Sequence, residues 1–89
     1  MIQEHLIISG RVQGVGFRAF ALDKARKFNI KGWIKNRSDG KVEAVIQGRE
    51  SDISKLLRFL EKGPAWARVD KIEMENEDED RIFKSFSIK

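Results

Sequence analysis

The chain has 89 residues, enough for one domain with a modest hydrophobic core and too few for two. Hydrophobic residues make up 40% and charged residues 36% of it, which excludes disordered and collagen-like compositions. The absence of Cys excludes disulfides, thiolate zinc sites and Cys nucleophiles, and the single histidine, His5, excludes a metal site built on a histidine pair. We expect a single domain over residues 1–89.

Positive charge is concentrated in the first half of the chain. Residues 1–49 contain ten Lys or Arg against four Asp or Glu, a net charge of +6, whereas residues 50–89 carry −2. A basic half indicates an anionic partner, either a small phosphorylated molecule or a nucleic acid. The apolar runs are too short to cross a membrane and no signal-peptide core is present, so we expect a cytoplasmic protein.

The first half of the chain begins with a predicted strand and a predicted helix. Residues 5–9 form an apolar run typical of a short buried strand, and a loop with two glycines follows at 11–16. From Phe17 to Phe28 the apolar residues recur at helical spacing. The charged residues expected on the outer face of this helix are Lys24, Arg26 and Lys27.

Two further strands and a hairpin turn come next. Residues 31–36 read as a strand, and the Asp-Gly pair at 39–40 precedes an alternating run at 42–47 that Gly48 ends. An Asp-Gly pair between two strand-like segments is a strong hairpin signal.

The second half contains a second predicted helix and one or two strands. Ser51 or Asp52 is expected to cap the helix, and Gly63-Pro64 to end it. The apolar stripe of this helix consists of Ile53, Leu56, Leu57 and Leu60. Residues 68–75 alternate as a fourth strand, with Ile72 and Met74 pointing inward and Lys71, Glu73 and Glu75 outward. Ile82–Ile88 is the candidate for a short fifth strand. The acidic run 75–80 is expected to be a solvated loop.

The predicted order is strand, helix, strand, strand, helix, strand. This βαββαβ order is typical of the ferredoxin-like sandwich, an α+β fold with an antiparallel sheet and both helices on one face. The fold hosts RNA binders, metal carriers, ligand sensors and enzymes, so function must be argued from individual residues.

The loop between the first strand and the first helix can bind an anion. Gly14 and Gly16 allow a sharp turn that brings successive N–H groups around one point, and the N-terminus of a helix adds unpaired donors. Arg18 lies in the first helical turn, where a cation makes sense mainly if an anion shares the site. The alternative is a tight connection followed by a solvated arginine.

Asn36 ends the second predicted strand and has two readings. It either closes the following turn by bonding its own backbone, or accepts a hydrogen bond from a water molecule and orients it beside the anion.

Two sequence blocks are similar to those of a known family. The run GRVQGVGFR at residues 10–18 closely resembles the acylphosphatase signature, and GWIKN at 32–36, followed by DGKVEA at 39–44, resembles that family's second block. Ile34 and Lys35 are mild variants within it. Further matching residues lie at 63–64, at 67–69, at Phe86 and at Ile88.

The resemblance implies a hydrolase that uses neither a metal nor an organic cofactor and converts acyl phosphates to a carboxylate and inorganic phosphate. By analogy, Arg18 binds the phosphate and Asn36 positions the attacking water. The implied phosphate cradle consists of the backbone N–H groups of Gln13, Gly14, Val15, Gly16, Phe17 and Arg18. A mixed anhydride is already activated, so its hydrolysis needs mainly positioning and charge stabilisation. We expect a monomer that inorganic phosphate, its product, inhibits competitively.

The chain departs from the family pattern at Ala65-Trp66, where a second proline and a smaller residue are frequent, and it has no Tyr. Trp66 is expected either to pack on the core or surface or to act as a lid. Trp33 and Phe17 are expected to pack within the fold rather than stack on substrate, and His5 to lie on a sheet face or edge.

Two other functions compete with this one. A nucleic-acid-binding module fits the basic half and the fold, but the strands lack the interleaved aromatic and basic residues of RNA-recognition sheets. Acylphosphatase-like modules also begin larger carbamoyl-transfer proteins. Because the chain starts at Met1 and ends just after the last predicted strand, we expect a free-standing enzyme.

Overall fold

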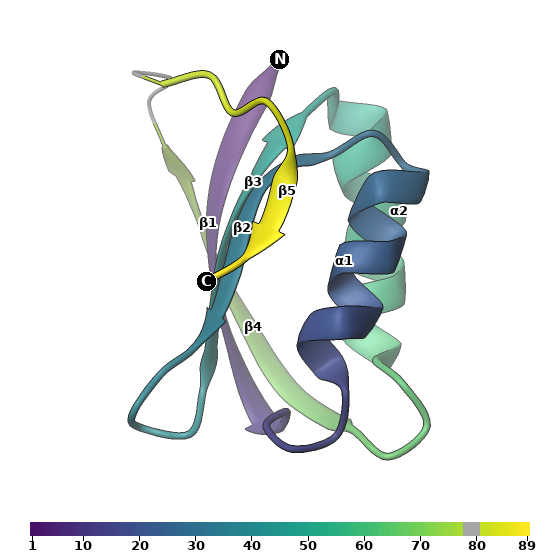
Figure 1. Ribbon diagram of the computed structural model, residues 1–89, viewed down its shortest axis with the longest axis vertical. Coiled ribbons are helices and arrows are strands. Elements are labelled where there is room, and N and C mark those ends of the chain that lie inside the picture. Colours follow the sequence, from purple (N-terminus) through teal and green to yellow (C-terminus); the bar gives the residue numbers. More distant parts are fainter. Residues whose placement is uncertain (78–80) are drawn as a thin grey trace.

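The computed structural model describes residues 1–77 and 81–89 and contains two helices packed on one face of a five-stranded sheet (Figure 1). The elements in chain order are β1 (Ile2–Arg11), α1 (Phe17–Lys27), β2 (Lys31–Asn36), β3 (Val42–Gly48), α2 (Glu50–Lys62), β4 (Arg68–Glu77) and β5 (Phe86–Ile88). The strand order across the sheet is β4-β1-β3-β2-β5. The predicted ferredoxin-like βαββαβ sandwich is confirmed.

The sheet is mixed rather than wholly antiparallel. β1, β2, β3 and β4 pair antiparallel, as expected, but β5 pairs parallel with β2, with Gly32 opposite Phe86. The fifth strand is shorter than the predicted segment at 82–88. Its direction follows from the chain path, because residues 81–85 approach the edge of β2 from the end of the sheet at which β4 finishes.

The core lies between the sheet and the two helices. β3 contributes Val42, Ala44 and Ile46, each at most 1% exposed, and β1 contributes Leu6 and Ile8, which are fully buried. The predicted alternation of β3 is only half correct, because Val45 and Gln47 on its other face are buried as well. The segment 81–83 explains the burial of Gln47, whose side chain is hydrogen-bonded to it.

α1 packs closely on the sheet because its buried face is made largely of small residues. Phe17, Ala21 and Ala25 are at most 1% exposed. Lys24 does not turn outward as predicted: its side chain is 20% exposed, and its ammonium lies 4.6 Å from the ring centre of Phe59 on α2. The lysine stem therefore covers apolar surface between the helices.

α2 buries the predicted apolar stripe but begins one turn earlier than expected. Ile53, Leu56 and Leu60 are at most 3% exposed, and Leu57 is half-buried. Neither Ser51 nor Asp52 is the N-cap, because the helix starts at Glu50 and the carbonyl of Arg49 accepts the first helical N–H groups. The Asp52 carboxylate instead accepts a hydrogen bond from Arg49 Nε, and it lies at the positive end of the helix dipole.

β4 departs from its predicted pattern because it is an edge strand. Ile72 packs against the core as expected, but Met74 is 50% exposed rather than inward. Residues 75–77 of the acidic run belong to β4 and are not a loop, and residues 78–80 lie outside the described residues. The backbone of residues 75–77 pairs with β1, where Gln3 Nε2 also donates to the Glu77 carboxylate.

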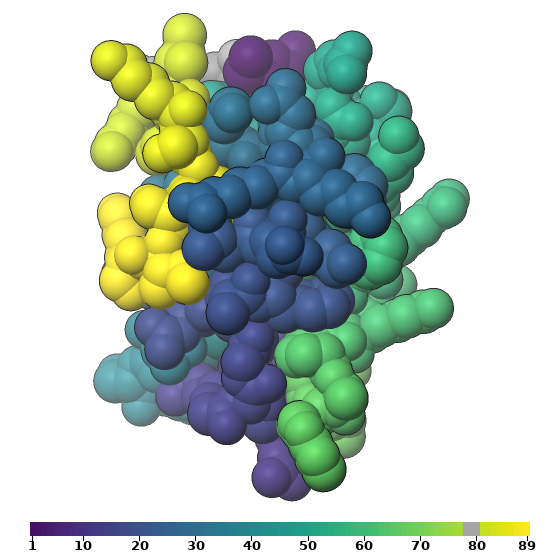
Figure 2. All heavy atoms as spheres, turned by 45° about the vertical axis from the view of Figure 1, so that its right-hand side comes forward, coloured from purple at the N-terminus to yellow at the C-terminus, as the bar shows by residue number. Residues whose placement is uncertain are grey.

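The helix face and the two ends of the sheet are distinct surfaces. Figure 2 shows α1 at the centre of the helix face, with the C-terminal segment on one side and α2 on the other.

Within the described residues, no helix has both the length and the apolar character needed to cross a membrane.

Candidate functional site

Three connections meet at one end of the sheet, at the bottom of Figure 1. They are the loop from β1 to α1, the turn from β2 to β3, and the loop from α2 to β4. The strand register explains their proximity, since Arg11 at the end of β1 lies opposite Arg68 at the start of β4. The glycine-rich loop and the turn that follows Asn36 therefore share one surface.

The loop between Val12 and Phe17 is held at both ends and open in the middle. Val12 and Phe17 are each 1% exposed and anchor it in the core. Gly14 and Gly16 have φ values of 74° and 80°, in the left-handed region where other residues are strained. A Cβ on either glycine would meet nothing within 4 Å, so the loop's outer surface is open.

The N–H groups of this loop are free to bind a ligand. In residues 1–77 and 81–89, no hydrogen bond is donated by the six backbone N–H groups from Gln13 to Arg18. The carbonyl of Gly16, by contrast, accepts the N–H of Phe20 and starts the helix. The first turn of α1 has no acidic residue, so nothing there neutralises the positive end of its dipole. Together these groups form an anion-binding surface.

Arg18 adds a full positive charge beside these donors. It is half-buried, in the first turn of α1, and no ion pair or hydrogen bond within the described part of the chain engages its guanidinium. Nearby cations differ in this respect: Arg37 is paired with Asp39 at 3.0 Å, and Lys35 lies 3.8 Å from Glu43. Arg18 is therefore available to an anion without first breaking an ion pair.

Asn36 lies at the end of β2, opposite Val42 of β3. Its Oδ1 atom is buried and accepts no hydrogen bond from the described residues. Buried polar atoms are nearly always satisfied, so an unpaired amide oxygen marks a position where a donor from outside the chain would be stabilised. The turn-closing reading, in which this oxygen bonds its own backbone, is wrong.

The side chain of Gln13 joins the loop to the turn beside Asn36. Its Nε2 donates to the carbonyl oxygens of Arg37 at 2.7 Å and Lys41 at 2.9 Å. From the sequence, only the backbone of Gln13 was expected to contribute to the site, and this side-chain contact was missed. A part-buried amide inside the motif was the available signal, but its partners lie 24 and 28 residues away in the chain.

The acidic groups near the site are engaged in ion pairs. A hydrogen bond from Arg37, followed by one from the N–H of Lys41, holds the pKa of the Asp39 carboxyl below its ordinary value. A hydrogen bond with His5, at 2.7 Å, is the main cause that lowers the pKa of Glu43. Both carboxylates thus stay ionised near neutral pH and are weak proton acceptors.

The remaining candidates lie where they contribute to packing or are exposed. Phe17 belongs to the core, and His5 lies on the open face of the sheet, both as predicted. Trp33 is on that open face too, with the ammonium of Lys89 4.3 Å from its ring centre. Trp66 is 79% exposed, so the expectation that it covers the core is wrong.

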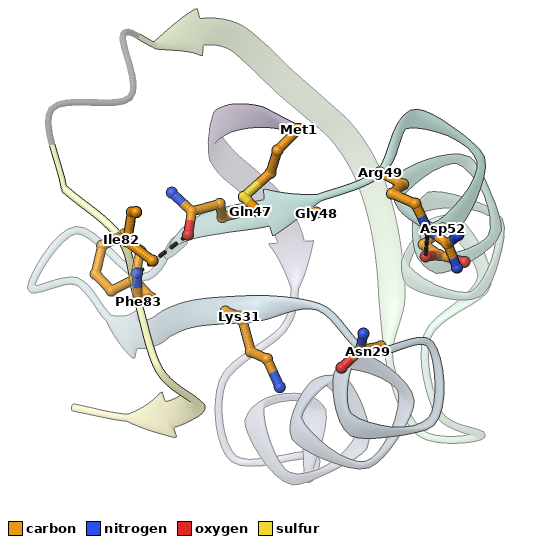
Figure 3. Close-up of a pocket in the computed structure, with 9 residues that line it drawn as sticks. All are labelled: Met1, Asn29, Lys31, Gln47, Gly48, Arg49, Asp52, Ile82 and Phe83. Carbon is orange, nitrogen blue, oxygen red and sulfur yellow. Dashed lines mark hydrogen bonds and ion pairs between the residues drawn. The ribbon is translucent and has the colours of Figure 1, made fainter.

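A separate pocket of about 330 Å³ lies at the opposite end of the sheet (Figure 3). Gln47 lines it together with Ile82 and Phe83, and the Gln47 amide is fully used by hydrogen bonds to Gln3, to the carbonyl of Arg81 and to the N–H of Phe83. None of the predicted site residues borders this pocket. Among the described residues, no three His, Asp or Glu side chains cluster closely enough to hold a metal ion.

Comparison with known proteins assigns this architecture to a family. The acylphosphatase family model matches residues 4–88. An acylphosphatase from Chloroflexus aurantiacus is 45% identical over 78 residues, covering 88% of this chain and 85% of the relative. The crystal structure of the Bacillus subtilis acylphosphatase superposes with a TM-score of 0.95 at 36% identity, covering 99% of this chain and 98% of that one.

A larger protein contains a similar unit. The crystal structure of T. kodakarensis HypF matches with a TM-score of 0.88 and 37% identity over 100% of this chain but only 12% of that chain.

The fold and its close structural matches define a two-layer α+β sandwich of the ferredoxin-like class. Within that class, the chain belongs to the acylphosphatase family. Membership supports hydrolysis of acyl phosphates as its activity.

Proposed function

We propose that this protein hydrolyses acyl phosphates by direct attack of an oriented water, using Arg18, Asn36 and the backbone of residues 13–18. The observation that carries the proposal is the set of six unpaired N–H groups beside an unpaired guanidinium. Preorganised donors of this kind stabilise the charge that develops on phosphate oxygens without having to reorganise. The substrate is a small molecule bound through its phosphoryl group.

Arg18 binds the phosphate in this mechanism. A guanidinium offers two parallel N–H groups that match two phosphate oxygens. The N–H groups of the cradle hold the remaining oxygens, and Gly14 and Gly16 allow the backbone to present them from one side.

Asn36 positions the water. Its buried, unpaired Oδ1 is a hydrogen-bond acceptor that suits a water O–H. Holding that water in line with the bond to be broken converts a bimolecular step into one between fixed groups. The hydrogen bonds from the Gln13 side chain to the turn beside Asn36 support a short distance between the Asn36 amide and the cradle.

The bond changes balance without a protein base. The water oxygen forms a bond to phosphorus as the phosphorus–oxygen bond to the acyl group breaks, and the carboxylate leaves with the bonding electron pair. Because Asp39 and Glu43 are ion-paired and keep their low pKa, the proton of the water passes to a phosphate oxygen. The leaving carboxylate needs no general acid, and the scheme assigns no role to a metal or organic cofactor.

The open face of the sheet argues against the nucleic-acid-binding alternative. By the strand register, lysines and glutamates share this face, and the ammonium groups of Lys35 and Lys71 lie 3.8 and 3.9 Å from the carboxylates of Glu43 and Glu73. Lysines paired in this way are not free to neutralise the phosphates of a nucleic acid. It stays a prediction that the protein is a cytoplasmic monomer and that it works as a free-standing enzyme rather than within a larger protein.

The test is hydrolysis of an aryl acyl phosphate, followed by ultraviolet absorbance in EDTA. We expect turnover by the wild type, competitive inhibition by inorganic phosphate, and a loss of roughly 10²-fold in kcat for Asn36→Ala. A folded wild type without turnover, or turnover that requires added metal, would contradict the proposal. Salt-dependent oligonucleotide binding by an inactive wild type would favour the alternative.

A further inference from the structure

We propose that the Gln13 side chain is a positioning residue that sets the distance between the phosphate cradle and Asn36. This inference rests on the proposed function and adds a role that acts through Asn36 rather than on the substrate. Its basis is the pair of hydrogen bonds from Gln13 Nε2 to the carbonyl oxygens of Arg37 and Lys41, at 2.7 and 2.9 Å.

The two acceptors lie at the neck of the β2–β3 turn, one residue beyond Asn36. Asn36 pairs with Val42, and the next residues outward, Arg37 and Lys41, are joined by a hydrogen bond of 2.8 Å from the Arg37 N–H to the Lys41 carbonyl. One amide nitrogen therefore contacts both sides of the turn. Any movement of the cradle away from Asn36 must lengthen one or both of these bonds.

The cradle has little else to hold it against the turn. Between the buried anchors Val12 and Phe17, the described residues show no other hydrogen bond from residues 13–16 to another strand or turn. Val15 packs against the hydrophobic core, but the open surroundings of Gly14 and Gly16 provide no further packing. Gln13 thus acts as a clamp between two segments that are far apart in sequence.

Loss of the clamp leaves the turn itself intact. The Lys41 carbonyl keeps the N–H of Arg37, and the Arg37 carbonyl keeps the N–H of Gly40 at 3.2 Å. Neither carbonyl becomes unsatisfied, so the main effect is freedom of the cradle relative to Asn36. Phosphate affinity depends on the cradle and Arg18 alone, whereas turnover also needs the water held by Asn36.

Gln13→Met is the informative variant, because it keeps the length of the side chain and removes both donors. We expect kcat to fall about tenfold or more, since small misplacements of reacting groups have large effects on rate. The inhibition constant of inorganic phosphate should change by less than about threefold. A double-mutant cycle with Asn36→Ala should show strong coupling, with Gln13→Met having little further effect on kcat in that background.

Gln47→Met is a matched control at the opposite end of the sheet. The Gln47 amide likewise makes two donor contacts, to Gln3 and to the Arg81 carbonyl, but it lies in the pocket of Figure 3. It should lower the midpoint of thermal unfolding and leave kcat within about twofold, as expected for a distant, independent site. An equal loss of kcat in both variants would overturn the proposal. So would a full effect of Gln13→Met in the Asn36→Ala background, or a parallel rise in the phosphate inhibition constant.

Amide hydrogen exchange tests the clamp without any turnover. In Gln13→Met the N–H of Phe20, which is hydrogen-bonded to the carbonyl of Gly16 in the cradle, should exchange faster than in the wild type, while in Gln47→Met its exchange should not change. Unchanged exchange would refute the clamp whatever the activity. Faster exchange in a protein that does not hydrolyse acyl phosphates would instead refute the proposed function and leave the clamp.

Discussion

Replacement of Arg18 by Ala separates binding of the phosphate from stability of the fold. Because Arg18 has no ion-pair partner among the described residues, its truncation removes only the packing of its half-buried stem. We expect the free energy of unfolding to change by no more than about 0.5 kcal/mol, as for other surface substitutions.

The magnitude of the catalytic effect follows from the contacts that a guanidinium makes with a phosphate. Two charge-assisted hydrogen bonds contribute about 1.5–3 kcal/mol each, or about 3–6 kcal/mol together. Since 1.36 kcal/mol corresponds to a factor of ten in rate, kcat/KM should fall by roughly 10²- to 10⁴-fold. Partial exposure of Arg18 to solvent weakens both bonds, so we expect the lower end, about 10²-fold.

Arg11→Ala is the matched control in this assay. Arg11 is exposed and is the last residue of β1, at the same end of the molecule as the loop. Arg11→Ala therefore changes the net charge there by the same amount as Arg18→Ala. Its effect on kcat/KM should stay within about threefold and diminish as salt is added. Arg18→Lys should lie between the wild type and Arg18→Ala, because an ammonium keeps the charge but loses the bidentate geometry. Equal activities of Arg11→Ala and Arg18→Ala would refute a specific role for Arg18.

Two further predictions concern stability and the loop. In Glu43→Gln the free energy of unfolding should change less between pH 7 and pH 4 than in the wild type. The hydrogen bond with His5 lowers the pKa of Glu43 on folding. The stabilisation from Glu43 is therefore present above its ordinary pKa of 4.5 and is lost as the pH falls through the lower folded value. Urea unfolding at both pH values measures this, and an unchanged pH dependence would contradict it. Gly16→Ala and Gly40→Ala, at φ 80° and 90° with open space around the added Cβ, should each cost about 1–2 kcal/mol of stability. Only Gly16→Ala should also lower kcat/KM, and equal loss of activity in both would argue against a special role for the loop.

Local sequence pattern was enough to predict most of the fold. The stripe of Ile53, Leu56 and Leu60 and the Asp-Gly turn at 39–40 each follow from side chains within a few residues of one another. The same is true of the candidate site, since two contiguous motifs contain Arg18 and Asn36. Patterns of this kind depend on backbone geometry that repeats within one helix or one hairpin, so a sequence reports them directly.

Tertiary structure decided the features that depend on distant neighbours. Met74 is exposed because β4 is at the sheet edge, and Lys24 is mostly covered because α2 places Phe59 beside it. The parallel direction of β5 likewise depends on the path of the chain around the sheet. No local periodicity contains this information.

The site shows the same division. The sequence determined which residue types surround the loop, namely two glycines, an arginine and an asparagine. Only the folded chain placed the Gln13 amide against the turn beside Asn36 and left the Asn36 Oδ1 buried without a partner. The physical reason is that a hydrogen bond depends on distance and direction in space, and its donor and acceptor here come from segments that meet only after the sheet has formed.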